Sequence, residues 1–340
     1  MEKNFDSQDG YEQEQKEYSP PTTGGDRPLA VVAMGGHAFM QHGDSGTIEQ
    51  HHHNAAEVSA VLMTLVERDY NLVITHGNGP QVGQLLLQND LTHEQVPPMP
   101  LDVLVADTEG WLGYVLQQAL LNQLRRRNIH RYVVSMITQV QVDKRDPAFS
   151  KPTKPVGRFL SQEEAEARRD ELGWVIAEDA GRGWRRVVPS PRPFKIVQRK
   201  MIRDAALNGH IVIAGGGGGI PIVKNAHDDY EGVEAVIDKD LTSSTLGVNI
   251  GAELLVILTD VDQVFVDYKK PTQRALGAVT MEEAERLITE GHFPAGSMGP
   301  KVEAIYEFLR KGGKRGMITN AATLEAALEG RGGTHFVGRL

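Results

Sequence analysis

The stretch His210-Ile-Val-Ile-Ala-Gly-Gly-Gly-Gly-Gly219 joins a short apolar run directly to five consecutive glycines. Short β-branched runs that end at glycine are typical of buried parallel strands, and glycine adopts backbone angles that other residues avoid. Three similar runs also end at loops: Leu29-Ala-Val-Val-Ala-Met34 at Gly35-Gly36, Leu72-Val-Ile-Thr75 at His76-Gly-Asn-Gly-Pro80, and Leu254-Leu-Val-Ile-Leu258 at Thr259-Asp-Val-Asp262. We therefore expect four parallel strands whose carboxyl ends carry ligand-binding loops.

Helical patterns lie between these runs, for example at residues 54–69 and 240–251. The alternation predicts an α/β protein with a mainly parallel central sheet and helices on both faces. Residues 141–193 break the alternation, because they are rich in proline, arginine and tryptophan, and we interpret them as an inserted subdomain or lid. Residues 1–27 are acidic, rich in glutamine and nearly free of aliphatic side chains. Such a segment cannot bury enough apolar surface to order itself, so we expect a disordered tail.

The composition excludes several classes of function. The formal net charge is -9, and no lysine- or arginine-rich face dominates, which argues against a nucleic-acid partner. There is no cysteine, so disulfides and zinc-thiolate sites are excluded. No apolar run approaches the roughly 20 residues that a membrane span needs. We expect a cytoplasmic protein without a membrane or nucleic-acid partner.

Three of the four loops are dominated by glycine, which points to an anion site. Glycine lets the backbone approach an anion closely, and successive N–H groups then form a positive concavity. The chain has no Gly-x-x-x-x-Gly-Lys-Ser/Thr motif, so this is not the usual mononucleotide loop. The run Gly215–Gly219 fits a dinucleotide-binding pattern only trivially, because Ile220-Pro221 follows where a helix should begin. A dehydrogenase is therefore the weaker alternative to a phosphate-handling enzyme.

Two lysines are candidates for neutralising a phosphoryl group, which needs positive charge more than covalent help. Lys239 lies in Asp238-Lys-Asp240 before a helical pattern, and Lys301 follows Gly299-Pro300 at the start of another. Most lysines are solvated surface charges, but a helix start disfavours cations and favours anionic ligands. Asp240 could orient both ammonium groups without taking a proton.

The triplet His51-His-His53 suggests a metal site at first sight. Adjacent helical residues point about 100° apart, so three in a row cannot close on one ion. We interpret the triplet as a solvated helix start and predict no protein metal site.

Several segments together make the chain similar to the carbamate kinases of the amino acid kinase superfamily. They run in family order from about residue 29 to the C-terminus. The most specific is Asp179-Ala-Gly-Arg-Gly-Trp184, which separates carbamate kinases from other amino acid kinases. The other segments are His76-Gly-Asn-Gly-Pro-Gln-Val-Gly83, Pro152-Thr-Lys-Pro155, Gly216-Gly-Gly-Gly-Ile-Pro221, Gly232-Val-Glu-Ala-Val-Ile-Asp-Lys-Asp240, and Gly291-His-Phe293 through Lys301.

The resemblance implies a three-layer αβα sandwich of about eight mostly parallel strands with an inserted protruding subdomain. It places an amino acid kinase domain at residues 28–340. Residues 28–205 would form a carbamate-binding lobe with a lid at about 141–193, and residues 206–340 a nucleotide-binding lobe. It also implies a homodimer and a phosphotransferase that moves phosphate reversibly between ATP and carbamate, used for ATP formation from carbamoyl phosphate. Mg²⁺ would be held mainly by the ATP or ADP phosphates and water.

The resemblance also assigns roles to individual residues. Lys239, Lys301 and the lid residue Lys151 would neutralise the moving group, with Asp240 organising the first two. The substrate would be held by Gly35, Gly36, His37, Gly77, Asn78, Gly216 and Gly217. The nucleotide would contact Thr259, Asp262, Tyr268, Met298 and Lys301.

Two departures from the family pattern leave alternatives open. His37 replaces the usual asparagine after the first glycine pair. In the lid, Ser150 stands where a lysine is usual, and Lys151 comes one residue later, which in an extended segment points a side chain to the opposite face. One alternative is a sister amino acid kinase acting on another small carboxylate or phosphate. Another is a catalytically silent regulatory relative, against which the intact Lys239, Asp240 and Lys301 argue.

Overall fold

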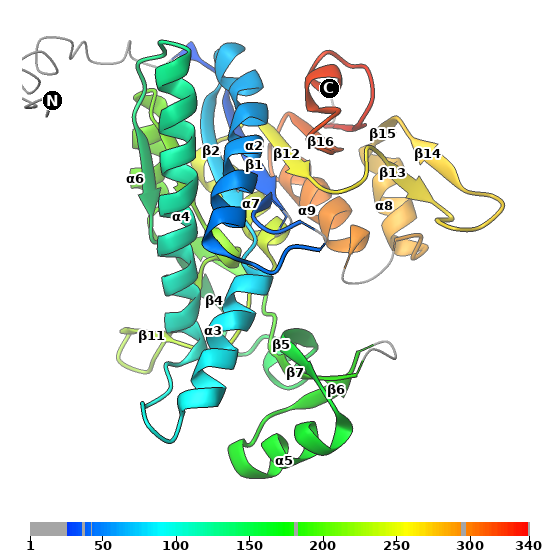
Figure 1. Cartoon of the computed structure of the whole chain (residues 1–340). Coiled ribbons are helices and arrows are strands. Elements are labelled where there is room, and N and C mark those ends of the chain that lie inside the picture. The colour runs from blue at the N-terminus through cyan, green and yellow to red at the C-terminus, as the bar shows by residue number, and fades with distance from the viewer. Residues whose placement is uncertain (1–25, 36–37, 42, 180–182, 294–296, 339–340) are drawn as a thin grey trace, which may run out of the picture.

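The computed structural model describes residues 26–35, 38–41, 43–179, 183–293 and 297–338. The predicted disordered tail therefore lies outside the described residues except for its last two positions. No helix in the described ranges is long and apolar enough to cross a membrane. The architecture is shown in Figure 1.

An eight-stranded sheet forms the centre of the molecule. Of its seven neighbouring strand pairs, only β16–β17 is antiparallel. The strand order is β15 (Ala278–Thr280), β17 (Thr334–Val337), β16 (Arg315–Thr319), β12 (Leu254–Leu258), β1 (Leu29–Met34), β2 (Asn71–His76), β9 (Ile211–Ala214) and β3 (Val133–Met136). The four strands expected from the sequence are neighbours in the middle of this sheet.

Each central strand is buried on both faces, which explains why its sequence is continuously apolar. Successive side chains of β1 alternate between two cores, with Val31 in one and Val32 in the other. The first core is completed by α6 (Arg199–Leu207), α7 (Lys239–Ile250), α8 (Met281–Thr289) and α9 (Met298–Arg310). The second is completed by α2 (Ile48–Glu67), α4 (Leu101–Arg126) and α10 (Leu324–Leu328). The predicted three-layer sandwich is confirmed.

Three smaller sheets flank the sandwich. The first contains β4 (Gln139–Val142), β8 (Pro193–Ile196), β10 (Ile220–Lys224) and β11 (Tyr230–Gly232). The second is a hairpin of β13 (Val264–Val266) and β14 (Arg274–Leu276). The third sheet, with β5 (Lys154–Leu160), β6 (Ile176–Glu178) and β7 (Trp184–Val188), carries α5 (Gln162–Leu172) and projects away from the sandwich (Figure 1). Short 3₁₀ turns occupy Pro147–Phe149 and Gly216–Gly218, and α3 spans Gly79–Thr92.

Helix α5 lies in the inserted segment, where the sequence showed little helical rhythm. Only Ala165 of this helix is buried, so it has no apolar periodicity to read. Its ends are nevertheless well defined. Ser161 and Glu164 form a capping box at the start, and Gly173 ends the helix in the left-handed conformation.

The carboxyl ends of the central strands meet at one edge of the sheet. Met34 is in register with His76 on one side and with Leu258 on the other. Leu258 is in turn paired with Thr319. The loops that begin at Gly35, Gly77 and Thr259 are therefore brought to the same edge, as open parallel sheets do with their ligand sites.

Candidate active site

Helix α7 begins beside this edge with a charged N-terminal turn. Asp238 is its N-cap, and its Oδ1 accepts hydrogen bonds from the backbone N–H groups of Asp240 (3.0 Å) and Leu241 (3.4 Å). Lys239 is thereby fixed at the first helical position, where a cation meets the unfavourable end of the helix dipole. A lysine held in this place requires compensating negative charge.

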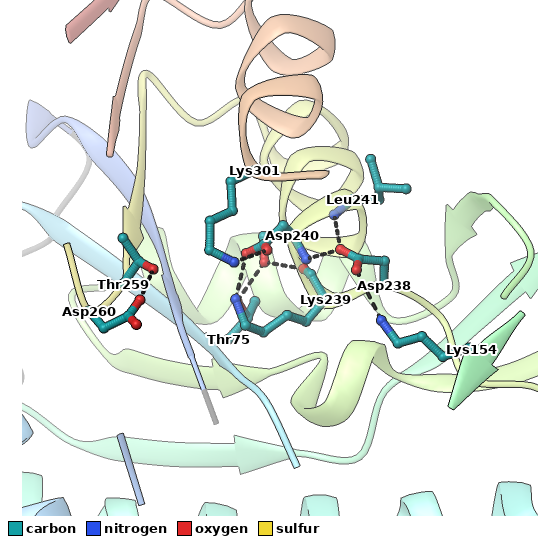
Figure 2. Close-up of polar contacts among 10 residues, drawn as sticks. Thr75, Lys154, Asp238, Lys239, Asp240, Leu241, Thr259, Asp260 and Lys301 are labelled. Atoms are coloured by element: carbon teal, nitrogen blue, oxygen red, sulfur yellow. Dashed lines mark hydrogen bonds and ion pairs between the residues drawn. The ribbon is translucent and has the colours of Figure 1, made fainter. Parts of the chain in front are cut away.

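That charge comes from Asp240, on which two lysines converge (Figure 2). Lys239 Nζ lies 2.5 Å from Asp240 Oδ1, and Lys301 Nζ from α9 lies 3.0 Å from Oδ2. All three side chains are largely buried. The cluster carries one net positive charge when both lysines are protonated and the aspartate is ionised.

The pKa values in the cluster follow from its geometry. Burial works against ionisation of Asp240, but the two ammonium groups outweigh it and lower the pKa of this carboxyl. Burial lowers the pKa of Lys239, assisted by the like charge of Lys301 and opposed by Asp240. Asp240 thus remains an anion that orients two cations, as the sequence suggested.

A cavity of about 770 Å³ adjoins this cluster. Its volume is in the range of pockets that take drug-sized ligands. Five of the predicted nucleotide and charge-neutralising residues line it, namely Lys239, Thr259, Tyr268, Met298 and Lys301, together with Gly35 from the first loop. Phe265, which the sequence reasoning missed, lies on the same wall, with its ring centroid 6.2 Å from that of Tyr268. Asp262 is exposed and does not line the cavity.

The loop Gly215–Gly219 is the second part of the site. Gly215, Gly217, Gly218 and Gly219 all have positive φ, between 64° and 98°, which explains the run of glycines. Thr242 of α7 donates from Oγ1 to the carbonyl of Gly218 (2.7 Å). The loop is therefore tied to the same helix that carries Lys239 and Asp240.

The loop after β2 packs against these glycines. A Cβ on Gly217 would lie 2.2 Å from Asn78 Nδ2, so only glycine fits here. Asn78 is buried and donates from Nδ2 to Thr108 Oγ1 (2.8 Å). Gly77, Asn78, Gly216 and Gly217 thus lie together but outside the lining of the cavity, while Gly36 and His37 are not among the described residues.

His76, just before this loop, is buried and electrically neutral. Burial lowers its pKa to about 4, and its Nδ1 lies 3.1 Å from the carbonyl of Gly77. Nδ1 therefore carries the proton that is donated to this carbonyl. Its ring fills the space beside Gly216, where a Cβ would come within 2.6 Å.

The protruding subdomain carries two lysines near this region, Lys151 and Lys154, and neither lines the cavity. Lys154 Nζ lies 3.2 Å from Asp238 Oδ2, so the N-cap of α7 is bound to the lid strand β5 (Figure 2). Lys151 is exposed, follows a 3₁₀ turn and is absent from the cavity lining within the described residues. Of these two lysines, Lys154 is the one held at the start of α7.

Arginines of the inserted segment and the first residue of the histidine triplet have structural contacts. Arg185 pairs with Asp179 (3.1 Å), and Arg186 pairs with Glu234 (2.5 Å), while Arg182 lies outside the described residues. His51 is not part of a solvated helix start, because its ring is buried against Trp111. Its Nδ1 lies 2.7 Å from the carbonyl of Thr47, one turn earlier, which the triplet pattern could not reveal.

This arrangement places a net positive cluster at the wall of the cavity, and α7 joins the same cluster to a loop in which four glycines have positive φ. Buried cations stabilise charge that spreads over a phosphoryl group during its transfer. The residues that could hold the phosphoryl donor and those that could hold the acceptor come from different loops at one edge of the sheet.

Comparison with known proteins agrees with this description. A carbamate kinase of Pyrococcus horikoshii is 47% identical over 306 residues, which cover 89% of this chain and 97% of that protein. The carbamate kinase-like protein YahI of Escherichia coli is 46% identical over 321 residues, which cover 92% of this chain and 99% of that protein. The solved structure of the Giardia lamblia carbamate kinase bound to AMP-PNP matches with a TM-score of 0.87 at 40% identity. The match covers 93% of this chain and 100% of that one. Because the model of the amino acid kinase family matches residues 28–320, this chain belongs to the amino acid kinase family.

Proposed function

We propose that this protein is a carbamate kinase, which transfers a phosphoryl group reversibly between ATP and carbamate to give ADP and carbamoyl phosphate. The observation that carries the proposal is the convergence of Lys239 and Lys301 on Asp240 at the rim of the cavity. The relatives that bear this name cover most of the chain, and one of them binds a nucleotide analogue.

The chemistry requires alignment and charge more than proton transfer. A carbamate oxygen attacks the γ-phosphorus of ATP, the new P–O bond forms, and the bond to the β-phosphate oxygen breaks with its electron pair remaining on ADP. Carbamate is already an anion, so no general base is needed. Lys239 and Lys301 neutralise the charge on the moving group, and Asp240 keeps both ammonium groups in place.

Mg²⁺ enters the proposal as the counter-ion of the nucleotide substrate, held by phosphates and water. In the described part of the chain no three His, Asp or Glu side chains gather as a protein-held metal site would need. No step of the proposed reaction is assigned to a protein-held metal ion.

The lid lysine of the proposed site is Lys154. Its pairing with Asp238 supports this choice over Lys151. The pair with Asp238 is charge-neutral, so Lys154 adds a third positive charge to the site only when its ammonium leaves Asp238 for the substrate. Lys154 belongs to the family-matching segment Pro152-Thr-Lys-Pro155, so this lid cation is kept although the lysine before it is displaced by one residue.

The test is turnover of purified protein with carbamoyl phosphate, ADP and Mg²⁺, followed as ATP formation. The same protein is assayed with a panel of acyl phosphates, because one close relative is named only carbamate kinase-like. Turnover strongly preferring carbamoyl phosphate supports the proposal. Preference for another acyl phosphate would assign the protein to a sister kinase, and nucleotide binding in calorimetry without any product would make it a silent relative.

We also propose a homodimer in which the edge of the main sheet takes part. Strand β3 is the last strand of that sheet, and the flanking Tyr132 and Ile137 are 49% and 47% exposed. Tyr114 on the neighbouring helix α4 is 58% exposed. Exposed large side chains beside an edge strand are typical of an interface. Light scattering should give a mass of two chains for the wild type. The double variant with Tyr114→Glu and Ile137→Glu should have the mass of one chain. A wild type with the mass of one chain contradicts the proposal.

A further inference from the structure

Glu109 is a buried acid to which the proposed reaction gives no direct role. It lies in the middle of α4 and is 1% exposed. Burial raises the pKa of this carboxyl to about 8, and the groups that donate to its two oxygens are the backbone amides of Thr138 and Gly216, not lysine or arginine side chains. A buried carboxyl without a cation is costly, so an apolar residue would serve better if packing were its only role.

The two amides belong to the loops that follow neighbouring strands. Thr138 N donates to Oε2 and Gly216 N donates to Oε1, each at 2.9 Å. Met136 and Ala214 are paired at the ends of β3 and β9. The two amides belong to the second residue after the end of each strand. A single carboxyl group therefore fastens both loops to one helix.

Thr138 extends this attachment along the glycine loop. Its Oγ1 accepts from Gly215 N (2.9 Å), and its carbonyl accepts from Ile220 N (2.9 Å). Gly218 and Gly219 donate to carbonyls within the loop itself. Four of the five glycine amides are thus engaged, and within the described residues Gly217 is the one left to face a ligand, beside Asn78.

A run of five glycines does not select its own conformation, because glycine has the largest choice of backbone angles. An external anchor is needed if the loop is to meet a substrate in one geometry. Replacing the anchor by an apolar side chain would leave two buried N–H groups without partners, each costing about 1–3 kcal/mol. The loop would then rearrange to recover those bonds.

We propose that Glu109 is a positioning residue that holds the Gly215–Gly219 loop in the conformation that receives the transferring phosphoryl group. The identity of that group rests on the proposed function, whereas the anchoring does not. Each carboxyl oxygen can accept a hydrogen bond, the hydroxyl oxygen of the protonated form more weakly, whereas the amide nitrogen of a glutamine cannot accept one. Glutamine should therefore replace Glu109 in part and leucine not at all.

The kinetic test compares Glu109→Leu and Glu109→Gln with the wild type. Misplacing reacting groups by about 1 Å costs about 100-fold in rate, so Glu109→Leu should lower kcat by about that factor. KM for ADP should change by less than about 3-fold, because the nucleotide cavity is lined by other elements. Glu109→Gln should recover part of the lost kcat. Gln123→Leu is the control, since it removes a buried side chain of the same helix that bonds to the carbonyl of Ala56 instead.

A second measurement keeps the inference testable independently of activity. Amide hydrogen exchange of the peptide that contains Gly215–Gly219 should be faster in Glu109→Leu than in the wild type or Gln123→Leu, at equal melting temperature within a few degrees. Unchanged exchange together with unchanged kcat in Glu109→Leu overturns the inference. An inactive wild type overturns the carbamate kinase proposal alone, and the exchange comparison then still decides the role of Glu109.

Discussion

Lys154 of the protruding subdomain and Asp238 are joined by an ion pair of 3.2 Å, so this subdomain is bound to the residue that caps α7. Asp238 uses its other carboxylate oxygen to hold the first turn of that helix. A movement of the lid can therefore reach Lys239 through one side chain. This contact distinguishes Lys154 from Lys151.

Replacing Lys154 by methionine should lower kcat about 10-fold or more, because it removes a cation next to the transferring group but keeps the side-chain length. The free energy of unfolding should change little, since a partly exposed ion pair contributes little to stability. Initial rates of ATP formation and urea unfolding provide the two measurements. Lys151→Met is the matched control, and a larger kcat loss in that variant than in Lys154→Met would reverse the assignment.

Lys301→Ala should reduce kcat by about 1000-fold or more, the size seen when a charge-stabilising cation is lost in phosphoryl transfer. Its ammonium is held at 3.0 Å from Asp240 beside the cavity, so both the charge and its position disappear. Lys311→Ala in the same region of sequence, which removes a half-exposed lysine paired with Glu307, should leave kcat unchanged. A loss below 10-fold in Lys301→Ala would remove this lysine from the chemistry.

Phe265→Ala should raise KM for ADP about 10-fold while kcat stays within about 3-fold. The ring lines the nucleotide cavity, and loss of a stacked aromatic side chain costs about 1–3 kcal/mol in base binding. Steady-state kinetics with ADP as the varied substrate provide the measurement. Tyr230→Ala, which removes an exposed ring from β11 outside the cavity lining, is the control. An unchanged KM would place the base elsewhere.

The pH dependence of stability should reveal Glu109. Its pKa is raised from 4.5 to about 8 in the fold, so the folded state keeps a proton that the unfolded chain has already lost. Stability should therefore fall as pH rises between these values, by about 2 kcal/mol from pH 6.5 to 8. The pKa of His76 is lowered from 6.5 to about 4. Its contribution to stability therefore rises with pH between about 4 and 6.5, which lies below this window.

Urea unfolding at several pH values between 6.5 and 8.5 checks this prediction. The side chain of the Glu109→Gln variant cannot ionise, so its unfolding free energy should not show this decrease. The unfolding free energy of the variant minus that of the wild type should therefore rise steadily with pH across the window. A difference that does not depend on pH would show that Glu109 already ionises below the window.

Much of the fold and part of the site could be predicted because the relevant residues are local in sequence. An apolar β-branched run ending at glycine specifies a buried strand and a special loop within ten residues. Lys239 and Asp240 are adjacent, so their association needs only the start of a helix. Lys301 was named from its place at a helix start, but no local pattern fixes its contact with Asp240, from which 61 residues separate it.

Other features depend on tertiary packing and have no local pattern. Whether Lys151 or Lys154 reaches α7 is decided by a 3₁₀ turn and by the pairing of β5 with β7. Glu109 resembles a surface acid in sequence, and only the meeting of α4 with two strand ends makes it an anchor.

The sequence by itself determined the buried strands, the loops where they end and the charged start of α7, since these follow from side-chain periodicity and from the backbone freedom of glycine. The tertiary structure decided which charges meet and which are buried. Burial and distance, which set the pKa of Glu109 and the pairing of Lys154 with Asp238, exist only once distant segments have packed together.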